Sequence, residues 1–351
     1  MTCDECEECR KNGYRYCIKC GRSFDEDGQE PDPAEEEPPI ESLLKKSVIP
    51  AMAVIVVAIL INLGVLFYNL GPTIDWVESQ TLTLYVYLFD FCPVITLEGV
   101  WVQFSMAIFA IALAFCSWYI LRKSRGALIF GSGYIKRTKD TPLYSLAMIL
   151  GAVMILEIAM TLLFNAAGLS TPVPSGLKDL TPEKALFLFS EAAVYEEIAF
   201  RVVLFGLPMV IVGLITRQKG FLKNLGGGFG VSKIAILFLI ISSVIFAYAH
   251  VSGWGLWKMF PVLLGGLAMG YLFMKFGLYA SIMFHMINDY MGVWAVTIPT
   301  LGSIVEILIL FTGLLCIPVL FKKLWLGLKG MKDLPLVRHD DQEESSDSSL
   351  N

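Results

Sequence analysis

The chain has 351 residues, of which 56% are hydrophobic and only 17% charged, and its mean hydropathy is +0.65. This composition excludes a soluble protein that hides its apolar side chains in one core, and it indicates an integral membrane protein. The formal net charge of -5 does not describe a binding surface, because the acidic residues gather near the two ends of the chain, and no nucleic-acid partner is expected.

Cysteines dominate the start of the chain, at Cys3, Cys6, Cys9, Cys17 and Cys20. Two Cys-x-x-Cys pairs hold four thiolates around a tetrahedral Zn²⁺, and a cytosolic location disfavours the alternative of disulfides. We therefore predict a structural zinc ribbon over residues 1–24, with the metal supplying most of its folding free energy. The spacing leaves open which four of the five cysteines bind zinc. We expect the ribbon to dock a protein partner or to regulate the protein.

An acidic, proline-rich segment follows at residues 25–46, with nine Asp or Glu between Asp25 and Glu41. Such segments bury too little apolar surface to order themselves, so we predict a disordered linker there and an acidic disordered tail at residues 331–351. No signal peptide is expected, because cysteines and acidic residues stand where its apolar stretch would be needed. The N-terminus is therefore expected in the cytosol.

Eight apolar stretches long enough to cross about 30 Å of hydrocarbon make residues 47–330 the membrane domain. They cover residues 48–70, 99–121, 143–167, 185–216, 234–250, 257–274, 278–298 and 301–321. The fourth is too long for one straight span, and Pro208 predicts a kink or break in it. Residues 82–95 are apolar but short, and we expect an interfacial or re-entrant segment. The predicted fold is an all-α polytopic membrane bundle of about eight transmembrane helices with a small N-terminal zinc ribbon.

Basic residues of the loops predict the orientation of this bundle in the cell membrane. With the N-terminus inside, the inner loops carry the basic residues between Arg122 and Lys139, between Arg217 and Lys233, and between Lys322 and Arg338. The outer loops carry only Lys178 and Lys184. Both termini are therefore expected to be cytoplasmic.

Three charged residues lie within six positions of the fourth stretch, in the sequence Glu196-Glu197-Ile198-Ala199-Phe200-Arg201. Each costs about 2.5 to 3.5 kcal/mol at mid-bilayer on insertion scales, so the group needs partners or a function. Glu197 and Arg201 are four residues apart on one helical face and can pair. Glu196 is rotated by about 100° and is left to meet another group. The structural alternative is an ion-paired cluster that only holds helices together.

Two of the three histidines also lie in membrane stretches, in Phe246-Ala247-Tyr248-Ala249-His250 and in His285-Met286-Ile287-Asn288-Asp289. A single membrane histidine is as often a hydrogen-bonding bridge as a catalytic group, but a carboxylate with two imidazoles forms a hydrolytic set. Counting residues from the predicted ends places His250 several ångströms nearer the outer face than Glu196 and His285. Glu157 and Glu306, in the third and eighth stretches, are expected to form hydrogen bonds between helices rather than line a cavity.

The order Glu-Glu-x-x-x-Arg, Phe-x-x-x-His and His-x-x-x-Asp on three membrane helices resembles the CAAX protease and bacteriocin-processing (CPBP) family, which includes the prenyl-protein endopeptidases. The resemblance covers roughly residues 140–300. It implies that Glu196 and His250 activate the water that attacks a peptide bond. It also implies that Glu197 and Arg201 fix the helix that carries them.

For the third motif, the resemblance implies that His285 and the residue four positions beyond it stabilise the oxyanion. That residue is Asp289, where asparagine is common in the family. An ionised carboxylate repels an oxyanion, so Asp289 must be protonated or must orient His285, with Asn288 as the other candidate donor.

The chemistry agrees with this resemblance, because amide hydrolysis needs a base for the water and preorganised donors for the oxyanion. The predicted function is an intramembrane endopeptidase that cleaves a membrane-associated peptide, such as a prenylated protein or a leader peptide. The alternative is a non-catalytic membrane protein, an immunity-type factor or a transporter, that uses the same polar cluster. Whether Glu196, His250 and His285 hold a metal is open, and the resemblance favours catalysis without one.

Overall fold

The computed structural model describes residues 39–87, 91–129 and 137–338. The predicted zinc ribbon and its five cysteines lie outside the described residues. The chain divides into two compact units, Met1–Lys46 and Ser47–Asn351, and the second contains the membrane bundle.

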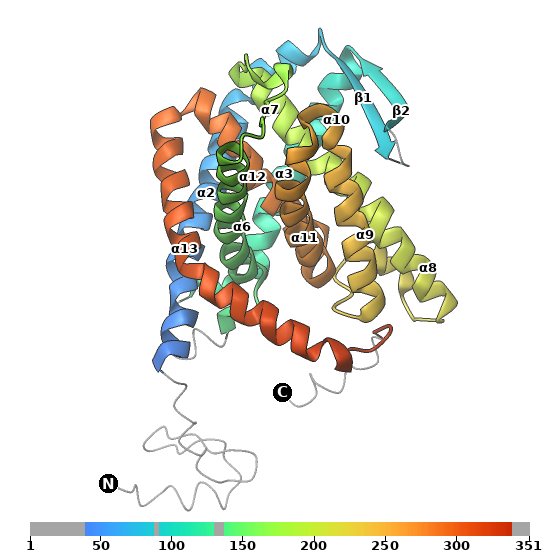
Figure 1. Cartoon of the computed structure of the whole chain (residues 1–351). Helices are drawn as coiled ribbons and strands as arrows, with labels where there is room; N and C mark the ends of the chain where they lie inside the picture. Colours follow the sequence, from blue (N-terminus) through green and yellow to red (C-terminus); the bar gives the residue numbers. More distant parts are fainter. Residues whose placement is uncertain (1–38, 88–90, 130–136, 339–351) are drawn as a thin grey trace, which may run out of the picture. The chain divides into compact units, whose positions relative to one another are not determined.

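Long apolar helices build the second unit (Figure 1). They are α2 (Pro39–Val77), α3 (Val100–Lys123), α6 (Pro142–Ala166), α7 (Pro182–Glu191), α8 (Leu207–Ile215), α9 (Lys233–Ala249), α11 (Met259–Phe276), α12 (Leu278–Thr297) and α13 (Pro299–Gly330). Two short α-helices, α4 (Arg125–Leu128) and α10 (Val251–Trp254), and four 3₁₀ turns, η1 (Ser175–Leu177), η4 (Phe221–Gly226), η5 (Leu256–Lys258) and η6 (Met331–Asp333), connect them.

Seven helices among the described residues are long and apolar enough to cross a membrane, which confirms the all-α membrane bundle. The seventh predicted stretch, at residues 278–298, is also a helix, α12, but it is not one of these seven spans. Its polar residues His285, Asn288 and Asp289 lower its mean hydropathy. It nevertheless follows the predicted bounds of 278–298 closely.

Protein rather than lipid surrounds α12, which contacts α3, α6, α7, α11 and α13. Most of its side chains from Ala280 to Ile287 are fully or almost fully buried. Ser190 of α7 and Tyr290 of α12 share a hydrogen bond of 2.8 Å between their hydroxyl groups. A central helix can carry polar groups at membrane depth because its neighbours, and not the bilayer, satisfy them.

Glycines bring α6 and α13 close together at Gly151 and Gly313. A Cβ added at Gly151 would lie 2.5 Å from the carbonyl oxygen of Ile309 and 2.7 Å from the Cα of Gly313. Small residues at membrane helix crossings allow this approach of the backbones. The same crossing anchors α6, whose Glu157 faces the candidate site.

The segment at residues 82–95, expected to be interfacial or re-entrant, lies in a β-hairpin. Strand β1 (Thr81–Tyr87) pairs antiparallel with β2 (Phe91–Glu98), with an irregularity in the register after Leu84. Alternating β-branched and aromatic residues in Thr81–Tyr87 favour a strand. The hairpin lies at the end of the bundle where α7 begins and where α10 is found (Figure 1).

The fourth span runs without a break from Pro182 to Ile215, so of the two alternatives predicted at Pro208, a kink or a break, the break was wrong. The irregularity instead precedes the proline, in the π-helical stretches η2 (Ala192–Glu196) and η3 (Ile198–Gly206). Pro208 follows these stretches near the start of α8 and, because the span is continuous there, removes one backbone hydrogen bond of the helix. Wider π-helical turns are rare and are frequent at functional sites.

Two predicted disordered segments are partly ordered. Helix α2 begins at Pro39, so the last residues of the predicted linker at 25–46 are helical, and residues 331–338 of the predicted tail pack onto the membrane domain. The backbone N–H groups of Lys233 and Ile234 donate to the carbonyl oxygens of Pro335 and Leu336, at 3.0 and 3.2 Å. Composition missed both because charged, proline and serine residues dominate each predicted segment as a whole.

Candidate active site

The predicted residues of three helices meet at one place. Glu196 lies at the end of η2, His250 directly after α9, and His285 in the middle of α12. The Oε2 atom of Glu196 is 3.8 Å from Nε2 of His250 and 3.8 Å from Nε2 of His285. The offset in depth expected for His250 therefore does not separate it from the other two.

Glu197 is the centre of a fully buried polar network. Its Oε2 is 3.2 Å from Nε of Arg201, as the four-residue spacing predicted. Its Oε1 is 3.1 Å from Nδ1 of His285, and the hydroxyl group of Ser281 donates to its Oε2. Glu197 and Arg201 have no exposed side-chain surface. The pair thus joins the fourth span to α12 and does more than fix its own helix.

Arg201 also contacts an aromatic ring, since its guanidinium carbon lies 4.9 Å from the centre of the Phe246 ring. Phe246 is buried and stacks edge-on against His250, with ring centres 4.7 Å apart. A cation over an aromatic face is stabilised when both are shielded from water. Phe246, predicted as part of the second motif, therefore packs between the ion pair and the imidazole.

One hydrogen bond determines how His250 presents its ring. Its Nδ1 is 2.9 Å from the carbonyl oxygen of Phe246, one helical turn earlier. A carbonyl oxygen only accepts, so Nδ1 carries the hydrogen. In the neutral ring, Nε2 then offers a lone pair on the side of Glu196.

His285 lies between carboxylates. Its Nδ1 faces Glu197, and its Nε2 is 3.4 Å from Oδ2 of Asp289. Asn288 donates to the other oxygen of Asp289, with Nδ2 and Oδ1 3.3 Å apart. The three residues of the predicted motif therefore form a chain in which Asp289 connects the amide to the imidazole.

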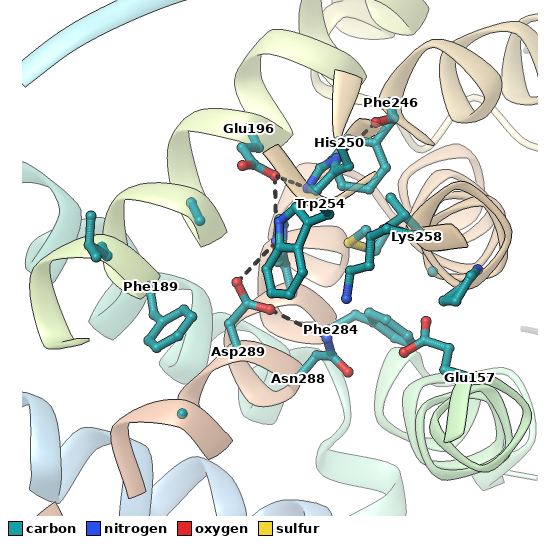
Figure 2. Close-up of a pocket in the computed structure, with 18 of the residues that line it drawn as sticks. Glu157, Phe189, Glu196, Phe246, His250, Trp254, Lys258, Phe284, Asn288 and Asp289 are labelled. Carbon is teal, nitrogen blue, oxygen red and sulfur yellow. Dashed lines mark hydrogen bonds and ion pairs between the residues drawn. The ribbon is translucent and has the colours of Figure 1, made fainter. Parts of the chain in front are cut away.

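A cavity of about 400 Å³ opens beside these groups and is lined by Glu196, His250, His285, Asn288 and Asp289 together with apolar side chains. Figure 2 shows that Glu157 and Lys258 also face it. Glu157 therefore lines the cavity, which is the role that the sequence favoured less.

A second cavity of about 380 Å³ shares Glu196, His250 and Trp254 with the first. Residues of β1 form one of its walls, and Glu191 and Tyr195 contribute to another. The hydroxyl group of Tyr195 donates to the carbonyl oxygen of Tyr85, which ties the hairpin to the fourth span. The site is thus reached from two sides, and the hairpin borders one of them.

Among the described residues, no group of three or more His, Cys, Asp or Glu side chains is arranged to hold a metal ion. In the candidate site, the distances of 3.8 Å from Glu196 to each imidazole are well above the roughly 2.0 to 2.2 Å of Zn²⁺ to its nitrogen and oxygen ligands, but a metal bridges its ligands and these distances alone do not decide the matter. The zinc predicted at the five N-terminal cysteines lies outside the described residues.

All seven predicted site residues of the membrane domain lie in this network or beside its cavity: Glu196, Glu197, Arg201, His250, His285, Asn288 and Asp289. Sequence reasoning missed Ser281, Glu191 and Lys258. Ser281 lies one helical turn before His285, a spacing that could have identified it. Glu191 lies five residues before Glu196, and only a π-helical turn brings such positions onto one face.

One of three comparisons with known proteins found a match. The apolar helices and a family match together support an integral membrane protease of the CAAX type. Residues 182–291, less than half of the chain, match the family described as type II CAAX prenyl endopeptidase Rce1-like. The matched segment runs from the start of α7 past Asp289 and so includes every predicted site residue of the membrane domain. Neither the comparison with curated proteins nor that with solved structures found a match.

Proposed function

We propose that the protein is an intramembrane endopeptidase that hydrolyses a peptide bond of a membrane-associated polypeptide, with Glu196 as the general base. The observation that supports this most is the position of the Glu196 carboxylate, 3.8 Å from two imidazoles that come from two other helices, at the edge of a cavity. A cluster that served only to hold helices together would not need a side chain that is 27% exposed at a cavity beside the fully buried ion pair.

The attacking water binds between Glu196 and His250. A separation of 3.8 Å is too long for a direct hydrogen bond, and Oε2 of Glu196 has no hydrogen-bond partner among the described residues. A water here donates one hydrogen to Glu196 and the other to Nε2 of His250. Its oxygen lone pair then points at the carbonyl carbon of the substrate.

Hydrolysis follows in two steps. The water oxygen bonds to the carbonyl carbon as Glu196 takes a proton, which gives a tetrahedral oxyanion. The carbon–nitrogen bond then breaks while the proton passes from Glu196 to the amine, so one water is consumed and Glu196 is again a carboxylate.

His285 supports the oxyanion through Nε2, which faces the cavity, while Nδ1 donates to Glu197. Both nitrogens donate only in the imidazolium form. Asp289 is 3.4 Å from the same Nε2 and orients the ring, and Asn288 supplies a further amide donor at the cavity wall. Glu197 and Arg201 act through His285 and position it.

The zinc ribbon at residues 1–24 forms part of the proposal as a structural metal site. Its support is the spacing of Cys3, Cys6, Cys9, Cys17 and Cys20. Zinc there would supply folding free energy to a segment too short to build a core, and no catalytic step needs it.

The test of the proposed function compares peptide termini of membrane proteins in cells that contain the native protein or its Glu196→Gln variant. The matched control is Glu98→Gln, which removes an exposed carboxylate at the end of β2. We expect a set of new termini that the control retains and Glu196→Gln lacks. Identical termini in all three would contradict the proposal and leave a non-catalytic membrane protein as the better reading.

A further inference from the structure

Basic residues gather at one end of the bundle. The hairpin, η1, the start of α7 and α10 define the hairpin end, and the end of α3, the start of α6, the segment between α8 and α9 and the end of α13 define the basic end (Figure 1). At the hairpin end, the described residues include Lys178, Lys184 and Lys258. At the basic end they include Arg122, Lys123, Arg125, Arg137, Lys139, Arg217, Lys219, Lys223, Lys233, Lys275, Lys322, Lys323, Lys329, Lys332 and Arg338.

Charge asymmetry of this kind orients membrane proteins, because short loops rich in Lys and Arg stay on the cytoplasmic side. The basic end is therefore the cytoplasmic end. With α12 added to the seven apolar spans, the described helices make eight crossings, so the residue-47 end of α2 and the C-terminal end of α13 lie on this same side (Figure 1). The hairpin end then faces the outer side.

Both cavities of the site belong to the hairpin end. The first is lined by Leu177 of η1, Trp254 of α10 and Lys258 of η5, and the second by Leu82 of β1 and Ser252 of α10. None of the residues that line either cavity comes from the loops of the basic end. A polypeptide that reaches Glu196 through these cavities comes from the hairpin side.

We propose that the substrate is a polypeptide segment exposed on the outer side of the membrane, which reaches Glu196 past β1 and α10. This inference rests on the proposed function and narrows its substrate class. A lipid-modified C-terminus in the cytosol lies at the basic end and cannot enter cavities that open at the hairpin end. A membrane-anchored or exported polypeptide whose cleavage site is exposed on the outer face can enter them.

Cysteine labelling tests the orientation without any need for catalysis. Ser175→Cys places a thiol at exposed η1 of the hairpin end, and Lys219→Cys places one in the exposed loop after α8. A membrane-impermeant maleimide is applied to intact cells and to permeabilised cells, and peptide mass spectrometry reads the introduced position, so native cysteines do not interfere. We expect the thiol of Ser175→Cys to react in intact cells and the thiol of Lys219→Cys to react only after permeabilisation. The reverse pattern would overturn the inference and leave Glu196-dependent hydrolysis unaffected.

The positions of the cleavage sites provide a second test of the proposed substrate class. Termini that depend on Glu196 are mapped to the inner or outer side of the membrane by their accessibility to an impermeant amine reagent in intact cells. We expect them on the outer side, and cytosolic termini would refute the substrate class while supporting the protease. Complete absence of Glu196-dependent termini would refute the protease itself, whatever the labelling shows.

Discussion

Oε1 of Glu197 lies 3.1 Å from Nδ1 of His285, although 88 residues separate the two in the chain. The second glutamate of the pair therefore holds the imidazole that faces the first glutamate. Glu197 therefore serves both the proposed activity and the stability of the fold, because the same carboxylate also neutralises the fully buried Arg201.

Replacing Glu197 by Gln should destabilise the protein strongly. The change leaves the Arg201 guanidinium buried without a counter-charge, and breaking a buried pair from one side costs about 3 to 5 kcal/mol. The loss of stability is measured as the difference in free energy of unfolding between purified Glu197→Gln and the control Glu98→Gln, both in detergent. Adding Arg201→Met to the variant should recover part of the loss, since no unpaired charge is then buried. Equal stability of Glu197→Gln and Glu98→Gln would show that the ion pair is not important for the fold.

Asp289 is expected to orient His285 and not to bind the oxyanion itself. Asp289→Ala should reduce kcat by about 10² to 10³, the typical effect of losing an oxyanion donor or its support. Asp289→Asn keeps a side-chain oxygen near Nε2 of His285 and should recover most of that loss. Steady-state rates on one peptide substrate decide the point. An Asn variant as slow as the Ala variant would mean that the negative charge of Asp289 is what matters.

Gly151 should not tolerate alanine. The added Cβ would meet backbone atoms of Ile309 and Gly313, so α6 and α13 must move apart, at a cost of about 1 to 3 kcal/mol. Gly327→Ala on α13 is the matched control, because a Cβ there has nothing within 4 Å. Unfolding of both variants in detergent provides the comparison. A Gly151→Ala protein as stable as the control would argue against this close crossing.

The N-terminal cysteines should account for the zinc of the protein. We expect about one zinc ion per chain by elemental analysis, lost in a Cys17→Ser, Cys20→Ser double variant and kept in His250→Ala and His285→Ala. Full loss of zinc in either histidine variant, with the cysteines intact, would instead place the metal at the membrane site.

Much of the fold and site was predictable, for physical reasons. Apolar length identifies membrane helices because the bilayer sets the span, and the spacing of Glu197 and Arg201 predicts their ion pair because one helical turn joins them. The π-helical turns around Glu196 were not predictable from the sequence. A π-helical turn differs from an α-helical turn in which backbone carbonyl each N–H group bonds, and no residue type specifies that difference. Glu191 was therefore missed along with them.

Packing between segments that are distant in the sequence was the other feature that could not be predicted. Lys258 of η5 and Glu157 of α6 face the same cavity, and neither lies in a motif. The strands of the hairpin were not predicted, because the alternation of side chains in residues 82–95 is hidden by a high overall hydrophobicity. Pairing with β2 and contact with Tyr195 decide its structure, and both are tertiary.

The rate of peptide-bond cleavage by purified Glu196→Gln, relative to the native protein and to Glu98→Gln, tests the central claim most directly. Membrane protein fragments identified by their Glu196-dependent termini serve as substrates. If Glu196 removes the proton from the attacking water, cleavage should fall by about 10² to 10⁴ while the fold and substrate binding persist. A Glu196→Gln protein that cleaves within tenfold of the native rate would contradict the account.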